Sequence, residues 1–239
     1  MKTSSHTNTH RRKSNTMDCN TPYGNALRAG VSPETIRYVE ERILPLYASF
    51  DKAHREGHAR MVISQSLDLA AHFPGINIDM VYLVAAFHDL GLAYGRENHH
   101  RHSRSILEAD GYVRAHFTAE ETTLMGEAVE DHRASGTLRP RNDYGLIVAE
   151  ADRCIDAATI IRRTIQYGLA HYPELDRQGH YKRAMQHLTE KYGSDGYLTV
   201  WLPWSTNAAK LKELRTLLAD RTALHALFTC IFKEETARK

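Results

Sequence analysis

Cysteine, long hydrophobic runs and net charge are all scarce in this chain of 239 residues. Its three cysteines, Cys19, Cys154 and Cys230, stand far apart and lack the C-x-x-C spacing of a structural zinc site. They indicate reduced thiols in a cytoplasmic protein and exclude a disulfide-stapled scaffold. The longest apolar run, residues 80–87, covers eight residues, whereas a membrane-spanning helix needs about 20. We therefore expect no membrane partner.

The charge is nearly balanced, with 31 lysines and arginines against 29 acidic residues. Residues 1–20 hold four of the basic residues and one acidic residue among many Ser, Thr and Asn. The charge of the rest is therefore close to zero, which does not favour a nucleic-acid partner. This composition predicts a disordered N-terminal tail over residues 1–20 and a single domain over residues 21–239.

Apolar residues recur at helical spacing through most of this domain, which predicts an all-α fold. Asp79 is the expected cap of a buried helix, Pro45 is an expected kink, and Thr118 with Glu121 forms a capping box. Only residues 196–202 have strand-like character, and no second region shows a core of its own. The expected helices cover residues 33–50, 51–73, 80–90, 99–110, 118–133, 144–172 (broken once), 177–192, 206–219 and 221–235.

Several ionisable residues occupy positions where a helix face should be apolar. The pair His88-Asp89 directly follows the apolar run, and Asp152, His58 and His132 each lie in an apolar stripe. A buried carboxylate costs several kcal/mol unless it is paired or bound to a metal ion. Helices that converge on a divalent ion would explain these positions, because His and Asp are common ligands.

The same residues also admit a purely structural interpretation. A lone buried histidine is often a hydrogen-bonded core residue, and Asp152 can pair with the adjacent Arg153. The histidine-rich residues 99–102 can form a solvated polar face. Spacing alone leaves both interpretations open.

Five strings in the chain resemble, in their order, the HD-domain superfamily of metal-dependent phosphohydrolases. The resemblance covers about residues 50–156, so residues 157–239 would be a helical extension of an HD-type bundle. The strings are Asp51-x-x-His54-x-x-x-His58, Ala85-Ala86-Phe87-His88-Asp89-Leu90-Gly91, His99-His100-Arg101-His102-Ser103, Glu130-Asp131-His132-Arg133 and Glu150-Ala151-Asp152-Arg153.

The resemblance implies one or two divalent metal ions, with Mn, Fe, Co, Ni, Zn and Mg all open. Asp89 would bridge the ions if there are two. His99 lies four residues before Ser103, which is the commoner spacing, and His100 is the alternative ligand. The implied ligands are His58, His88, Asp89 and Asp152 for the first ion, and Asp89, His132 and either His99 or His100 for the second.

One departure from the family concerns the charge that neutralises phosphate. Many members carry a lysine directly after the glycine of the His-Asp-x-Gly string, where this chain has Leu92. Arg96 and Arg133 are therefore expected to act as catalytic residues together with Asp89, and Arg153 is a further candidate. Arginine suits this task because it contacts phosphate through two parallel hydrogen bonds.

The implied reaction is hydrolysis of a phosphate ester or anhydride by hydroxide formed at the metal, with a nucleotide as the expected substrate class. Glu150 and Asp131 are near enough in sequence to be considered for moving protons. Two other functions stay open, a di-iron oxygenase and a non-catalytic protein that senses a nucleotide. The aromatic residues between Tyr197 and Trp204 either cover the site or fill the core. A homo-oligomer is compatible with the sequence, although no stripe marks an interface.

Overall fold

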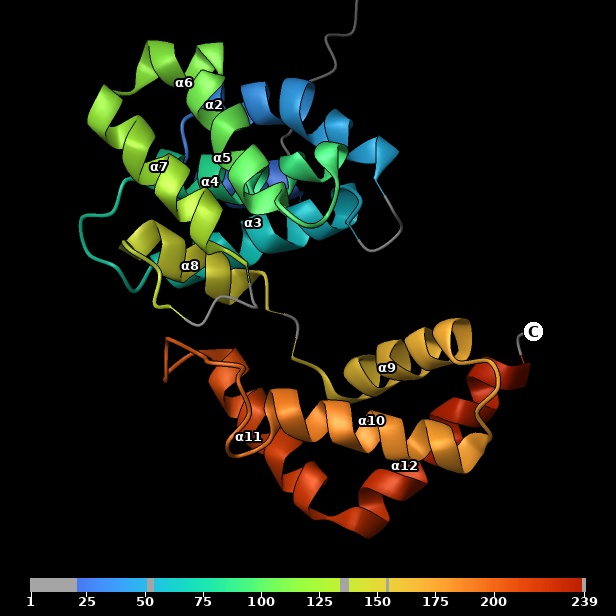
Figure 1. Ribbon diagram of the computed structural model, residues 1–239. Helices are drawn as coiled ribbons and strands as arrows, with labels where there is room; N and C mark the ends of the chain where they lie inside the picture. The colour runs from blue at the N-terminus through green and yellow to red at the C-terminus, as the bar shows by residue number, and fades with distance from the viewer. Residues whose placement is uncertain (1–20, 51–53, 134–137, 154, 238–239) are drawn as a thin grey trace, which may run out of the picture.

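The fold is built from helices that form two lobes joined by a short link after α8 (Figure 1). The computed structural model describes residues 21–50, 54–133, 138–153 and 155–237. The expected tail, Asp51, Cys19 and Cys154 lie outside these ranges. No strand occurs within the described ranges, so the predicted all-α class is confirmed. None of the helices in these ranges combines the length and the hydropathy that crossing a bilayer requires.

Helices α1 to α8, with three turns of other helix types, form the first lobe. They are α1 (Pro22–Arg28), α2 (Pro33–Tyr38), π-helix η1 (Val39–Ile43), 3-10 helix η2 (Leu44–Ser49), α3 (Glu56–Ala70), α4 (Ile78–Phe87), 3-10 helix η3 (Leu90–Tyr94), α5 (His99–Ala109), α6 (Gly111–His116), α7 (Ala119–Asp131) and α8 (Asp143–Ala151). The second lobe contains α9 (Ala157–His171), α10 (Arg177–Tyr192), α11 (Thr206–Ala219) and α12 (Arg221–Ala237).

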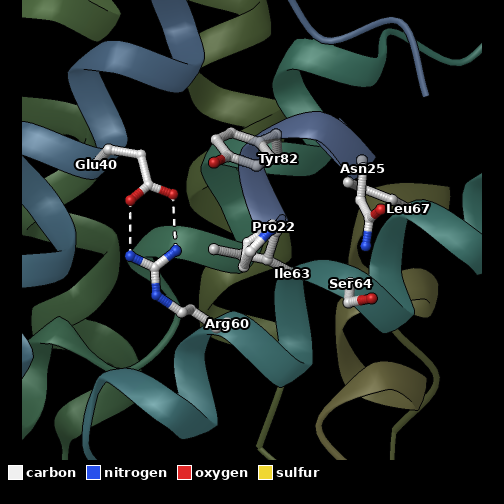
Figure 2. A pocket seen from close by; sticks show the side chains of 8 residues that line it. All are labelled: Pro22, Asn25, Glu40, Arg60, Ile63, Ser64, Leu67 and Tyr82. Atoms are coloured by element: carbon white, nitrogen blue, oxygen red, sulfur yellow. Dashed lines mark hydrogen bonds and ion pairs between the residues drawn. The ribbon is translucent and has the colours of Figure 1, made fainter. Parts of the chain in front are cut away.

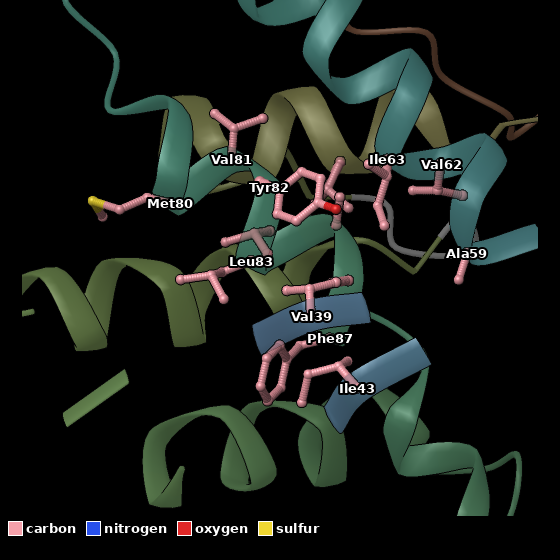
Figure 3. Close-up of a cluster of buried hydrophobic side chains, with 14 of the residues drawn as sticks. Val39, Ile43, Ala59, Val62, Ile63, Met80, Val81, Tyr82, Leu83 and Phe87 are labelled. Carbon is pink, nitrogen blue, oxygen red and sulfur yellow. The ribbon is translucent and has the colours of Figure 1, made fainter. Parts of the chain in front are cut away.

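Helix α4 is the centre of the first lobe. Every residue from Met80 to Phe87 is buried, and α3, α5, α7, α8 and η1 all pack against this helix. Figure 3 shows side chains of α3 and η1, among them Val62 and Ile43, around the α4 residues Tyr82 and Phe87. A helix that is apolar all round is stable only in such an interior. The chain therefore reaches His88 and Asp89 while still inside the lobe.

The caps of two helices test the sequence reasoning. At α7 the predicted capping box is confirmed, with the Glu121 backbone N–H donating to Thr118 Oγ1 at 3.2 Å. At α4 the predicted cap is wrong, because Asn77 Oδ1 accepts from the first backbone N–H groups. Asp79 instead accepts a hydrogen bond from the Ser32 backbone N–H at 2.9 Å, which ties the start of α2 to α4.

Helix boundaries differ from the expected ones mainly where a helix changes type or stops. The segment expected as one helix over residues 33–50 turns into a π-helix at Val39 and a 3-10 helix at Leu44, next to the kink expected at Pro45. The segment 144–172 is broken between α8 and α9, because the Asp156 side chain caps a new helix. Residues 196–202 have no regular secondary structure, and the expected helices do not include the short α1 and α6.

The second lobe has a hydrophobic cluster of its own, which the sequence pattern did not indicate. Amphipathic helices show which face is buried but not which helix covers it, so one core and two cores give similar patterns. A single domain over residues 21–239 stays a prediction. The buried members of this cluster include Ile161, Leu188, Leu214, Phe228 and Ile231.

The aromatic segment before α11 contacts the first lobe. The ring of Trp204 lies 4.5 Å from the ring of His72 and 6.3 Å from that of Phe73, measured between centroids. Both partners follow the end of α3. Trp204 therefore packs between the two lobes and is 48% exposed.

Candidate metal centre

The ends of five helices bring the expected histidines and aspartates together. His58 lies in the first turn of α3, His99 begins α5, and the other four residues follow α4, α7 and α8. Two groups result, and within each group the candidate ligand atoms lie within 4.8 Å of one another. The first group is His58, His88 and Asp152, and the second is Asp89, His99 and His132.

The spacing within the first group fits a single metal ion. His58 Nε2 lies 3.1 Å from Asp152 Oδ1 and 3.3 Å from His88 Nε2, and His88 Nε2 lies 4.0 Å from Asp152 Oδ1. Ligand atoms about 2.1 Å from an ion are about 3.0 Å apart in octahedral geometry and about 3.4 Å apart in tetrahedral geometry. The three atoms thus have nearly the separations of neighbouring ligands.

The second group has the same dimensions. His99 Nε2 lies 3.2 Å from His132 Nε2 and 3.7 Å from Asp89 Oδ1, and the distance from His132 Nε2 to Asp89 Oδ1 is 3.5 Å. The carboxylate of Asp89 also faces the first group, because its Oδ2 lies 3.3 Å from His88 Nε2 and 3.5 Å from His58 Nε2. One buried carboxylate therefore presents one oxygen to each group.

Hydrogen bonds to backbone carbonyls orient three of the rings. Nδ1 of His88 donates to the Ala85 carbonyl at 2.8 Å, Nδ1 of His132 to Val129 at 2.5 Å, and Nδ1 of His99 to Arg96 at 2.8 Å. In a neutral imidazole the other nitrogen, Nε2, then carries a lone pair. Such a bond on the outer nitrogen is the usual support of a metal-ligating histidine. The donor set therefore fits divalent metal ions.

The charges in the centre stabilise each other when no ion is present. Burial acts to lower the pKa of His58, but hydrogen bonds to Asp152 and Asp89 outweigh it and raise this pKa to about 9. Burial acts to raise the pKa of Asp89, but the nearby charge of His88 and hydrogen bonds from His132 and His58 hold it far below its usual range. Burial also acts to raise the pKa of Asp152, but the hydrogen bond from His58 and the nearby histidine charges outweigh it and lower this pKa. In the metal-free protein, the positive charge of protonated His58 thus balances the two aspartates, as a metal cation would.

His99 and His100, the alternative ligands that the sequence left open, have different positions in the structure. His99 belongs to the second group, whereas His100 belongs to neither group. Neighbours on a helix diverge by about 100°, so the His100 ring turns away from Asp89. Burial and the charge of Arg133 lower its pKa to about 4, and its Nδ1 is buried without a hydrogen-bond partner among the described residues.

The candidate phosphate-binding arginines differ in their placement. Arg96 is exposed, and its Nη2 lies 3.3 Å from Nδ1 of His54, whose ring is 5.7 Å from that of His58. Arg133 is also exposed and donates to the Glu97 carbonyl at 3.0 Å. The two guanidinium groups therefore lie beside the two ligand groups.

Three other charged candidates are already engaged elsewhere. Arg153 is buried and donates to the Ala149 carbonyl at 2.7 Å. Glu150 is fully buried and accepts a hydrogen bond from Ser205, and Asp131 pairs with Arg141 at 2.8 Å. These contacts occupy Glu150 and Asp131, the two carboxylates considered for proton transfer.

Two supporting features escaped the sequence reasoning. The hydroxyl of Tyr47, which is fully buried, donates to the Ala86 carbonyl at 2.9 Å, next to the end of α4. Gly91 lies so close to α5 that a Cβ there would be 2.0 Å from the His99 carbonyl oxygen. The Gly91 backbone N–H also donates to Ser103 Oγ at 2.8 Å. The partners of Tyr47 and Gly91 lie too far along the chain for a local pattern to reveal them. Only the glycine in the string Ala85-Ala86-Phe87-His88-Asp89-Leu90-Gly91 pointed to a special position.

A cavity of about 80 Å³ lies against α3 (Figure 2). Its lining includes Tyr82, Ile63 and the ion pair of Glu40 and Arg60, whose two N···O distances are 2.6 and 2.7 Å. Positions 60 and 63 lie about 200° and 140° around the helix from position 58. The cavity is therefore separate from the metal centre.

The comparisons agree with the geometry. Residues 55–156 match the family model of the HD domain, and this span contains all six residues of the two groups. This region, residues 55–156, is therefore an HD domain, the domain of the HD superfamily of metal-dependent phosphohydrolases. No curated protein and no solved structure matches the chain. HD domains bind divalent metals, and the buried groups found here can hold them.

Proposed function

We propose that this protein is a hydrolase that uses two divalent metal ions to cleave a phosphate ester or anhydride bond, with a nucleotide as its substrate class. The observation that carries the proposal is the carboxylate of Asp89, which offers one oxygen to each of two ligand groups. Such bridging suits a pair of ions that act on one phosphoryl group.

The proposed ligands are the residues of the two groups, with His99 and not His100 in the second. These residues would hold divalent ions, which would supply a lowered pKa of bound water and positive charge for a phosphoryl group. Arg96 and Arg133 are exposed beside the groups and bind the remaining phosphate oxygens. The carbonyls of Ala85, Val129 and Arg96 keep the rings oriented throughout.

The structure offers more support for a hydrolase than for the two alternatives. A protein that only senses a nucleotide has no chemical need for two complete and buried ligand groups. An oxygenase needs two irons and an oxidisable substrate, and the four histidines of the groups also suit iron. Metal content and phosphate release together separate the three functions.

The test compares the full chain with Asp89→Ala. Metal per chain is measured by elemental mass spectrometry, and phosphate release is followed with nucleoside mono-, di- and triphosphates after loading with Mn²⁺ or Co²⁺. Asp68→Ala is the matched control, because Asp68 is an exposed aspartate of α3 outside both groups.

The expected result is about two ions per chain and metal-dependent phosphate release, both lost in Asp89→Ala and kept in Asp68→Ala. Two bound irons with oxidation of substrate and no phosphate release would support the oxygenase. Nucleotide binding that survives metal removal and leads to no turnover would support the sensor.

A further inference from the structure

The last turn of α8 is held by the second lobe. Glu150 is 0% exposed, and Ser205 Oγ donates to its Oε1 at 2.5 Å. The side-chain amide of Asn207 donates to the backbone carbonyl of the same glutamate at 2.8 Å. Ser205 and Asn207 stand 55 and 57 residues further along the chain, at the start of α11.

The residue that this turn presents to the metal centre is Asp152. It is the C-cap of α8, and its backbone N–H donates to the Val148 carbonyl at 2.9 Å. Positions two apart on a helix point about 200° away from each other. Glu150 therefore faces the second lobe while Asp152 faces His58, 3.1 Å away.

The hydrogen bonds of Ser205 and Asn207 to Glu150 join the end of α8 to the start of α11. The carbonyl of Glu150, near the end of α8, accepts from the Arg153 backbone N–H at 3.2 Å and also from the Asn207 amide. Ser205 is the N-cap of α11 and accepts from the Ala208 backbone N–H at 3.1 Å. The end of α8 and the start of α11 thus form one hydrogen-bonded unit.

A neighbouring contact reaches the other helix that supplies the first ligand group. Trp204 directly precedes Ser205 and packs on His72 and Phe73, just beyond the end of α3. Helix α3 carries His58. Residues 204–207 therefore touch the elements that supply two ligands of the first group.

We propose that Ser205 and Asn207 are positioning residues of the metal centre, through which the second lobe holds Asp152 against His58. This inference rests on the metal centre of the proposed function. Neither residue touches an ion or substrate, so each acts through Glu150 and the last turn of α8. Loss of either hydrogen bond lets Asp152 move and weakens the first group.

The test measures Co²⁺ binding to the full chain by titration calorimetry and by the visible absorption of bound Co²⁺. Asn207→Leu removes the amide donor but leaves the Ser205 cap of α11 in place. Ser205→Ala removes the hydroxyl, and Ser205→Thr restores it. Ser194→Ala is the control, because Ser194 is an exposed serine of the same lobe and its hydroxyl contacts Asp195.

We expect about 10-fold weaker binding of one Co²⁺ and an altered absorption spectrum in Asn207→Leu and Ser205→Ala, as for other residues that support a metal ligand. Ser205→Thr and Ser194→Ala should bind as the wild type does. Melting curves show that each variant is folded at the temperature of the titration.

Unchanged Co²⁺ affinity in both folded variants would overturn the inference, even if the protein hydrolyses phosphate. Weaker binding in both variants would support it, even if no phosphate substrate is cleaved and the proposed function fails. A wild-type chain that binds no divalent ion would overturn both.

Discussion

The Nε2 atoms of His99 and His132 lie 3.2 Å apart, while the Nδ1 atom of each ring donates to a backbone carbonyl. If both rings are neutral, two lone pairs face each other at this distance and repel. A proton on one ring or a cation between them removes the repulsion. Because Asp89 Oδ1 lies 3.5 Å from one of these atoms and 3.7 Å from the other, a shared divalent ion satisfies all three groups.

Separate substitution of His99 and His100 should show which of the two adjacent histidines binds a metal ion. We expect His99→Ala to reduce the bound metal from about two ions to one, because the second group loses a nitrogen ligand. His100→Ala should keep both ions, since its ring lies outside both groups. Elemental mass spectrometry of the two purified variants measures the difference. The reverse pattern would assign the ligand to His100 and contradict the geometry.

Much of the centre could be predicted from sequence because the residues next to it have strong local patterns. The apolar run before His88 predicts a buried helix, and the capping box at Thr118 predicts where the helix before His132 begins. These local signals need no knowledge of distant contacts. The choice between His99 and His100 failed at the sequence level because both lie in the first turn of one helix.

Features that depend on partners far along the chain could not be predicted. Tyr47 occupies an ordinary apolar position of its helix, and its hydroxyl partner lies 39 residues away. Glu150 was considered for proton transfer because it stands near Asp152 in sequence. Its actual partner, Ser205, lies 55 residues further on and belongs to the other lobe. Periodicity identifies the buried face in each case but carries no information on what covers it.

Removal of the Tyr47 hydroxyl should destabilise the protein modestly. Tyr47→Phe keeps the ring but leaves the buried Ala86 carbonyl without this donor, so we expect a loss of about 1 kcal/mol in the free energy of unfolding. Urea denaturation of the metal-free protein measures it. Tyr94→Phe is the control, because Tyr94 is 70% exposed. Equal stability of both variants would show that the Tyr47 hydroxyl contributes nothing.

Metal binding at the first group should release a proton at pH 7. The pKa of His58 in the metal-free protein is raised to about 9, so the ring is protonated at neutral pH and must lose its proton to become a ligand. Affinity should therefore rise with pH up to about 9. Calorimetry at pH 7 in buffers of different ionisation enthalpy counts the protons released, and a heat that does not depend on the buffer would contradict the prediction.

The same shift makes the metal-free protein less stable at high pH. Because the folded pKa of His58 lies above its unfolded value of about 6.5, its interaction with Asp152 and Asp89 stabilises the fold fully below that value. The stabilisation is lost as the pH rises through about 9. Melting temperatures of the metal-free protein between pH 6 and 10 test this prediction. In His58→Gln, the fall in melting temperature that comes from deprotonation of His58 should be absent.

Close approach of two backbones makes Gly91 a demanding position. In Gly91→Ala the new Cβ would meet the His99 carbonyl oxygen at 2.0 Å and the Ser103 backbone nitrogen at 2.6 Å, and neither is a flexible side-chain atom. Helix α5 must therefore shift, which should cost about 1–3 kcal/mol of stability and move His99 away from Asp89. Gly57→Ala is the matched control, because a Cβ at Gly57 has no neighbour within 4 Å. We expect Gly91→Ala to melt at lower temperature and to lose one metal ion, and Gly57→Ala to match the wild type in both measurements. A Gly91→Ala variant with two ions and an unchanged melting temperature would show that α5 does not depend on this contact.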